Sequence, residues 1–71
     1  MTDQRVYVIR HGALFLSALR RTRWVTSDEL ARRFHTHNAA VRFLVALSAD
    51  ENRAEYEYVI ESFYPPSREV L

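Results

Sequence analysis

The chain has 71 residues, no cysteine and a hydrophobic content of 48%. This length predicts one domain spanning residues 1–71, with modest stability that a dimer would increase. The absence of cysteine excludes a disulfide framework and a cysteine-ligated zinc site. No apolar run approaches the roughly 18 residues of a membrane span, and the first residues lack the pattern of a signal peptide. We therefore expect a cytoplasmic protein without a membrane partner.

Charge is unevenly distributed along the chain, although the formal net charge is only +1. Residues 1–49 contain eight arginines and three acids, a balance of +5, whereas residues 50–71 contain two arginines and six acids, a balance of −4. One part of the protein can therefore face an anion, while the other part repels it.

The first part of the chain contains a candidate strand and a candidate helix. Residues 5–9 are β-branched and aromatic, which favours a short strand, although the same residues can also open a helix. Residues 13–21 place apolar side chains at three- and four-residue spacing, which predicts a first helix. Trp24 and Val25 then form a short apolar connector.

Two further helices are predicted between residues 26 and 49. Thr26 and Glu29 have the spacing of a capping box, so we expect a helix to begin there and to continue to about residue 35. Residues 35–38 suit a tight turn, and the helical pattern resumes over residues 39–49. The chain is thus expected to contain two short helices joined by a turn.

The C-terminal part is expected to form a turn, a strand and a loose tail. Residues 50–52 break the helical pattern and indicate the turn. Residues 54–64 alternate, which predicts a half-buried strand. One face of this strand would carry Tyr56, Tyr58, Ile60 and Tyr64, and the other Glu55, Glu57 and Glu61. Pro65 and Pro66 end the strand because proline cannot donate to a ladder, and residues 65–71 form the tail.

The pair of helices resembles the winged helix-turn-helix family of DNA-binding domains, in its small phage or bacterial regulator type. The resemblance covers residues 27–46, where the family's core positions are matched by Leu30, Ala31, Phe34, Val41 and Leu44. The family's turn usually carries a glycine followed by an apolar residue, and this chain has His35 and Thr36 there. The resemblance implies a mainly α fold with a small antiparallel β element, built from three helices plus a C-terminal strand or hairpin.

The same resemblance implies a sequence-specific transcriptional regulator that binds double-stranded DNA as a homodimer. The helix from about Asn38 to Ala49 would then be the recognition helix in the major groove. The expected base contacts are His37, Asn38, Ala39, Arg42 and Phe43. The expected phosphate contacts are Arg20, Arg21, Arg23, Arg32 and Arg33. The alternative for these arginines is a solvated face that stabilises helix ends.

A second function remains open, because two features do not suit a DNA reader. An outward Phe43 in a recognition helix indicates an apolar partner, and the C-terminal strand is acidic where a wing over DNA is usually basic. The alternative is a small protein-binding adaptor or inhibitor of the anti-repressor type, which uses Phe43 and the acidic strand to bind a protein partner.

We expect no enzyme activity, catalytic residue, cofactor or metal site. The segment Arg10-His11-Gly12 is similar to the opening of the histidine phosphatases, whose chemistry needs a second histidine and another arginine held by a large α/β sheet, but a chain of 71 residues with a single glycine cannot supply that sheet and its loops. We therefore attribute the similarity to chance. His35 and His37 have no evident third ligand beyond His11.

Overall fold

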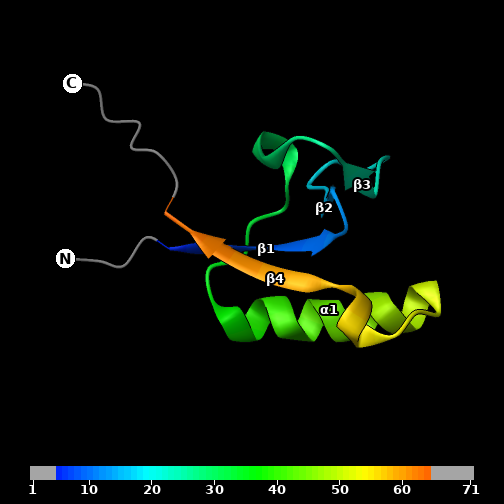
Figure 1. Ribbon diagram of the computed structural model, residues 1–71. Helices are drawn as coiled ribbons and strands as arrows, with labels where there is room; N and C mark the ends of the chain where they lie inside the picture. Colours follow the sequence, from blue (N-terminus) through cyan, green and yellow to red (C-terminus); the bar gives the residue numbers. More distant parts are fainter. Residues whose placement is uncertain (1–4, 65–71) are drawn as a thin grey trace, which may run out of the picture.

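The computed structural model describes residues 5–64 as one α-helix packed against a four-stranded antiparallel sheet (Figure 1). The strands are β1 (Val6–His11), β2 (Leu14–Leu16), β3 (Trp24–Val25) and β4 (Val59–Phe63), in the spatial order β3-β2-β1-β4. The helix is α1 (His37–Glu51), and two single 3-10 turns are η1 (Asp28–Leu30) and η2 (Glu55–Glu57). With one α-helix instead of three in the described residues, the predicted mainly α, winged helix-turn-helix fold is wrong.

The predicted helix over residues 13–21 is replaced by β2 and a loop. A two-residue turn at Gly12 and Ala13 brings β2 antiparallel to β1, and Gly12 has a φ of 65°, which glycine adopts without strain. The predicted strand over residues 5–9 is confirmed as the start of β1. A short apolar run suits a strand as well as a helix, so its periodicity alone does not decide between them.

The predicted helix starting at Thr26 is only the single turn η1. Ser27 caps this turn in place of Thr26, since the Ser27 Oγ accepts a hydrogen bond from the backbone N–H of Glu29 at 3.2 Å. The chain then leaves the helical conformation because residues 31–34 make backbone hydrogen bonds to β1 and β2.

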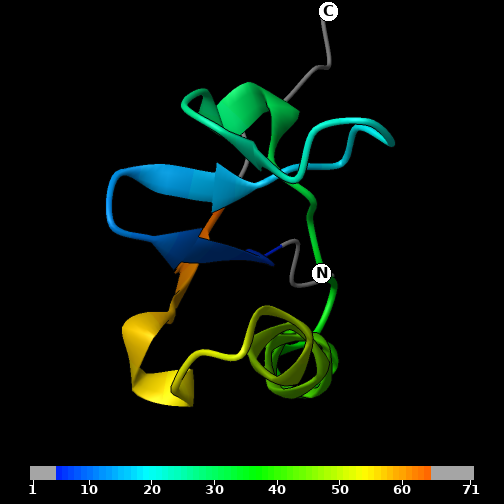
Figure 2. The ribbon, with the colours of Figure 1, turned by 90° about the vertical axis from the view of Figure 1, so that its right-hand side faces the viewer.

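The segment 31–36 joins the upper part of the sheet to the helix. Ala31 bridges to Ser17 beyond the end of β2, and Phe34 exchanges two backbone hydrogen bonds of 2.9 Å with Tyr7 of β1. Figure 2 shows this segment running from η1 along one side of the sheet to α1. These long-range bonds hold α1 beside the strands.

Helix α1 confirms the predicted helix over residues 39–49 and extends it at both ends. Thr36 caps its start, since the Thr36 Oγ1 accepts a hydrogen bond from the N–H of Ala39 at 3.1 Å. The helix ends at Asn52, which has a left-handed φ of 57°. The predicted turn over residues 50–52 is therefore wrong at its first two positions, which belong to the helix.

The predicted strand over residues 54–64 forms only in its second part. η2 occupies the first part, and β4 pairs antiparallel with β1 from Val59 opposite Arg10 to Phe63 opposite Val6. Tyr56 on η2 is 87% exposed, whereas Tyr58 is only 5% exposed, so the predicted common face of the tyrosines is wrong. The predicted tail over residues 65–71 lies outside the described residues.

The core lies between α1 and the sheet. Of the five predicted core residues, Ala31, Phe34 and Leu44 are buried, Val41 is half-buried, and Leu30 is 43% exposed on η1. The joint core contains Ile9, Leu16, Phe34, Ala40, Leu44, Leu47 and Tyr58.

The other face of the sheet is also covered near β1. The strand register places Val8 on the same face as Phe63 and Phe15. The guanidinium of Arg33 lies 5.6 Å from the ring centre of Phe63, and the guanidinium of Arg10 lies 5.0 Å from that of Phe15. Long arginine stems shield apolar surface in this way, and Val8 is fully buried.

Candidate nucleic-acid interface

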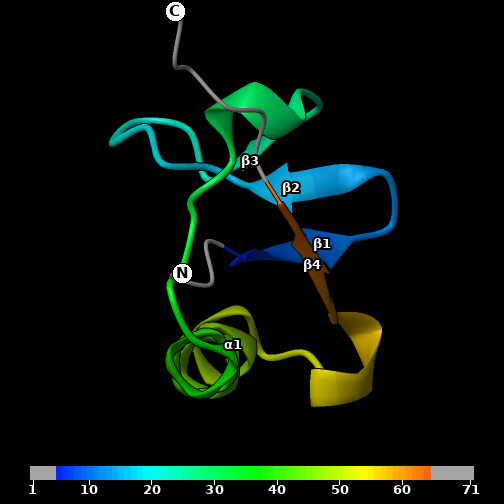
Figure 3. The ribbon, with the colours of Figure 1, turned by 90° about the vertical axis from the view of Figure 1, so that its left-hand side faces the viewer.

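Three segments that carry exposed arginines follow one side of the molecule. Figures 2 and 3 show the loop 17–23, the segment 31–36 and α1 on this side, with η2 on the opposite side. The loop is held in shape by a backbone hydrogen bond of 2.7 Å from the N–H of Ser17 to the C=O of Arg23, and by one of 2.8 Å from the N–H of Leu19 to the Ser17 Oγ. An ordered loop presents its side chains at a lower entropic cost.

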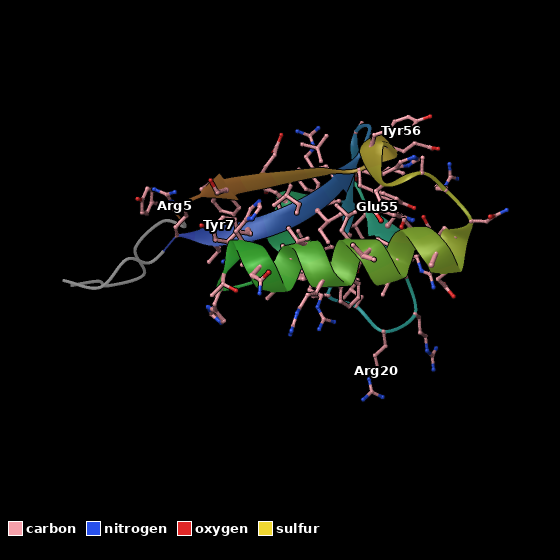
Figure 4. The ribbon with its side chains drawn as sticks, turned by 90° about the horizontal axis from the view of Figure 1, so that it is seen from below. Arg5, Tyr7, Arg20, Glu55 and Tyr56 are labelled. Atoms are coloured by element: carbon pink, nitrogen blue, oxygen red, sulfur yellow. The ribbon has the colours of Figure 1, made fainter. Side chains whose placement is uncertain are left out.

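A shallow hollow of about 310 Å³ lies between this loop and α1. It is lined by residue 16, residues 17 and 19–23 of the loop, and Phe43 of the helix. Arg20 and Arg21 both line it, and Figure 4 shows Arg20 pointing away from the body of the protein. The hollow is therefore open, partly apolar and bordered by basic residues of the loop.

Phe43 connects the hollow to the next arginine. Its ring packs edge-on against the ring of Phe34 at 5.4 Å, and the guanidinium of Arg32 lies 4.8 Å from its centre. Phe43 is half-buried, so it is a packing residue and offers only part of its ring to a ligand. The stacking holds Arg32 beside the hollow.

Most of the exposed arginines on this side have no carboxylate partner. Among residues 5–64, no ion pair forms at Arg20, Arg21, Arg32 or Arg42, and these four residues are called the arginine face below. The acids Asp28 and Glu29 lie on the nearby η1 and make no ion pair with it. Unpaired guanidinium groups remain available for phosphate oxygens.

The expected base contacts lie on α1, beside this face. His37, Asn38, Ala39 and Arg42 are all exposed, and the His37 ring also packs edge-on against Tyr7 at 5.6 Å. At about 100° per residue, the ridge of α1 that faces away from the core consists of Asn38, Ala39, Arg42, Val45, Ala46 and Ala49. Three of these six side chains are alanine, and Val45, which is 43% exposed, adds an apolar group to the ridge.

Two of the expected phosphate contacts are placed elsewhere. Arg33 stacks on Phe63, on the face of the sheet opposite α1. Arg23 is bound to acids at the end of α1, with its Nη1 3.0 Å from Asp50 Oδ2 and 3.2 Å from Glu51 Oε2. These two guanidinium groups thus interact with other side chains of the protein, and the structure does not bring them into the arginine face.

The main polar cluster of the described residues is centred on Glu51, which the sequence analysis assigned to a turn. Glu51 Oε1 accepts a hydrogen bond of 2.6 Å from the Tyr58 hydroxyl, and Oε2 accepts one of 3.0 Å from the Trp24 indole N–H. The Glu51 side chain is only 13% exposed, and Arg23 and Arg53 lie within salt-bridge distance of it. The cluster joins β3, the end of α1 and η2 with β4.

The aromatic rings of this cluster surround a histidine. His11 lies 5.6 Å from the Trp24 ring and 5.4 Å from the Tyr58 ring, and those two rings stack at 6.1 Å with an interplanar angle of 11°. The His11 Nε2 is 3.8 Å from Glu57 Oε1. His11 therefore packs within this cluster of side chains.

One signal in the sequence could have indicated that α1 extends to Glu51. Asn52 follows it, and asparagine is a common residue after a helix C-terminus.

The hydrogen bonds of the cluster shift two pKa values in opposite directions. Burial acts to raise the pKa of Glu51, but the hydrogen bonds from Tyr58, Trp24 and Arg23 outweigh it, so the pKa of Glu51 lies below its ordinary value. Burial, together with the hydrogen bond to Glu51, raises the pKa of Tyr58 to about 12. Glu51 is thus held ionised and Tyr58 is held neutral.

We expect the folded protein to lose stability as the pH rises from about 10, the ordinary tyrosine pKa, toward about 12, the pKa of Tyr58 in the fold. The raised pKa means that the folded state favours the neutral phenol, and ionisation would place a phenolate against the Glu51 carboxylate. Spectrophotometric titration should show a phenol step near pH 12 that is absent from Tyr58→Phe. An unchanged high-pH step in that variant would contradict this assignment.

Within residues 5–64, no group of three or more histidine or acidic residues could hold a metal ion. No helix in that range is long and apolar enough to cross a membrane. No protein family, characterised protein or solved structure matches this chain.

Proposed function

We propose that this protein binds double-stranded DNA with the arginine face, in which Arg20, Arg21 and Arg32 hold the phosphate backbone and Arg42 reaches the bases. The observation that carries the proposal is that Arg20, Arg21, Arg32 and Arg42 are exposed, lie on segments that follow one side of the molecule, and have no carboxylate partner within residues 5–64 (Figures 2 and 3). By contrast, Arg10 pairs with Glu61 at 2.9 Å. Arginine groups that stay free of every acid in the described part of the chain favour an external anion.

The distribution of charge supports one orientation on the nucleic acid. Figure 4 shows Arg20 on the opposite side of the molecule from Glu55 and Tyr56 of η2. Phosphates would attract the first side and repel the second, because the field around each side has its own sign. The acidic surface then points away from the duplex, which resolves the conflict between an acidic C-terminal part and a DNA partner.

The exposed ridge of α1 suits a groove next to the bound phosphates. α1 has 15 residues, and its outward ridge combines small alanines with Asn38 and Arg42. An amide can pair with adenine and a guanidinium with guanine in the major groove. Under this proposal Arg20, Arg21 and Arg32 supply affinity that is independent of sequence, and Asn38 and Arg42 supply sequence preference.

We expect fluorescence-anisotropy titrations with a labelled duplex to show binding that weakens steeply between about 50 and 200 mM salt. Arg21→Ala should weaken binding to all duplexes alike and reduce the slope of log affinity against log salt by about 1. Arg42→Ala should reduce the difference in affinity between duplex sequences. Arg53→Ala is the matched control, since Arg53 already pairs with Glu57 at 3.3 Å, and it should leave the slope unchanged.

The proposal fails if the wild-type protein shows no salt-sensitive binding to any duplex at low ionic strength. It also fails if Arg53→Ala and Arg21→Ala reduce the slope equally, because binding would then reflect total charge and not the arginine face. Circular dichroism of each variant shows that a loss of binding is not a loss of fold.

A protein partner is the second candidate, supported by one feature of η2. Tyr56 is 87% exposed and stands between Glu55 and Glu57, an aromatic side chain at the centre of an acidic surface. Exposed tyrosines are enriched in protein interfaces. This candidate uses the side of the molecule away from the arginine face, so Tyr56→Ala should leave duplex binding unchanged if DNA is the partner of that face.

A further inference from the structure

Strand β4 forms one edge of the sheet. It pairs with β1 on one side, over five residues from Val59 to Phe63, and the strand order places no strand on its other side within residues 5–64. The opposite edge, β3, has only two residues. β4 is therefore the longer edge available for pairing with another strand.

The hydrogen bonds of β1 determine which β4 groups face this open edge. Both the N–H and the C=O of Tyr7 bond to Phe34, on the side of β1 away from β4. Tyr7 is opposite Ser62, so these two residues form a non-hydrogen-bonded pair, and such pairs alternate along an antiparallel ladder. The backbone N–H and C=O of Ser62 and Ile60 thus point outward, and no described residue bonds to them.

We propose that β4 pairs antiparallel with β4 of a second copy of this chain, about a two-fold axis at Ser62. Ser62 would form a hydrogen-bonded pair with the partner's Ser62, and Ile60 would do so with the partner's Tyr64. Ser62 and Ile60 present outward backbone groups, and Tyr64 would do so if the alternation continues one residue beyond β4, as this antiparallel ladder requires. The proposal is independent of the proposed DNA function, because it uses neither the arginine face nor α1.

Charge favours this register over its neighbours. In the Ser62-centred register, Phe63 lies opposite the partner's Glu61. Arg33 stacks over Phe63 and has no carboxylate partner in the described part of the chain, so it would stand beside the partner's Glu61 as a second guanidinium, next to the Arg10 that pairs with Glu61 at 2.9 Å within each copy. Each copy contributes one such pair, giving two across the interface.

The other registers are less compatible with the geometry. Centring the axis on Glu61 would still pair the outward groups of Ser62 and the partner's Ile60, but it would place Glu61 directly against the partner's Glu61, a like-charge pair that destabilises the ladder. Centring the axis on Ile60 would pair Phe63 with the partner's Glu57. Glu57 belongs to the 3-10 turn η2, so its backbone is not extended and cannot continue the ladder. The exposed apolar residues Val59 and Tyr64 flank the strand in either copy.

A single-cysteine walk along β4 tests the register, because the chain has no cysteine of its own. Under mild oxidation, Ser62→Cys should form a covalent dimer, since Cα atoms of a hydrogen-bonded pair lie about 5.5 Å apart, within disulfide range. Glu61→Cys and Phe63→Cys should cross-link at least tenfold less, because their own counterparts lie diagonally at about 7–8 Å. Ala49→Cys on the exposed ridge of α1 is the background control.

Sedimentation equilibrium tests the pairing itself. Ser62→Pro removes an N–H that points to the open edge, so it breaks no hydrogen bond to β1. This variant should be a folded monomer of 8.4 kDa. Wild type and Ser62→Ala should both reach twice that mass. A wild type that stays monomeric at millimolar concentration overturns the proposal. So does a dimeric Ser62→Pro, or a cross-link that is strongest at a position other than 62.

Discussion

Glu51→Ala is expected to lower the free energy of unfolding by about 2–4 kcal/mol. The substitution removes the acceptor for both the Tyr58 hydroxyl and the Trp24 indole N–H, which are bonded to Glu51 at 2.6 and 3.0 Å. Each donor left without a partner in a buried position costs about 1–3 kcal/mol. A domain of this size has a total stability of roughly 4–10 kcal/mol, so the loss is a large fraction of it.

Urea or thermal unfolding followed by circular dichroism measures this loss, with Asp50→Asn as the matched control. Asp50 is the neighbouring acid and binds the same guanidinium, that of Arg23 at 3.0 Å, but its side chain is 63% exposed. Exposed ion pairs contribute only about 0–1 kcal/mol. If Asp50→Asn destabilises the fold as much as Glu51→Ala, the buried acceptor is not the important feature of this cluster.

The same cluster predicts a loss of stability in acid. The pKa of Glu51 is lowered in the fold, so its contribution is complete above the ordinary carboxyl value of about 4.5 and is lost as the pH falls through the lowered pKa. In Glu51→Gln this acid-dependent loss should be smaller than in the wild type, because the amide does not titrate. An identical acid dependence in the two proteins would show that other carboxylates are responsible.

Ala40→Leu is expected to destabilise the fold by about 1–3 kcal/mol. Ala40 is 0% exposed in the core between α1 and the sheet. Three additional carbon atoms at this position must displace either the helix or the neighbouring side chains, since a close-packed interior has no free volume for them. For a domain of this size, the melting temperature should fall by about 4–8 °C for each kcal/mol.

Ala39→Leu is the control for this prediction because it makes the same chemical change one residue away. Ala39 is exposed on the outward ridge of α1, so the larger side chain meets only solvent and the stability should change by less than about 0.5 kcal/mol. Under the proposed function, the same variant should weaken duplex binding by bulk alone. Equal destabilisation by the two substitutions would contradict the packing of α1 described here.

Local patterns in the sequence predicted the elements that do not depend on distant partners. The helix over residues 39–49 and the strand over residues 5–9 are both present. A helix of 15 residues with Thr36 at its start and Asn52 at its end carries its own start and stop signals, although the prediction overlooked them and ended the helix too early. Exposure of Asn38 and Arg42 also follows from helical periodicity alone.

The errors lie where two parts of the chain compete for the same backbone groups. Residues 13–21 and 27–34 have apolar spacing that suits short helices, but β1 pairs with residues 14–15 of the first segment and with Phe34 of the second, and only the single turn η1 stays helical. A single long-range pairing, such as that between Tyr7 and Phe34, cannot be inferred from local periodicity. The winged helix-turn-helix prediction failed for this reason, because it needed residues 27–34 as a helix.

The sequence by itself determined the position of α1 and the uneven distribution of charge, with a basic first part of the chain that has enough arginines to face an anion. Only the tertiary structure decided that Arg20, Arg21, Arg32 and Arg42 have no ion pair among residues 5–64, and that Arg23 is bound to Asp50 and Glu51. The physical reason is that composition and periodicity are local properties, whereas ion pairing and strand pairing depend on which distant segments the folded chain brings within a few ångströms.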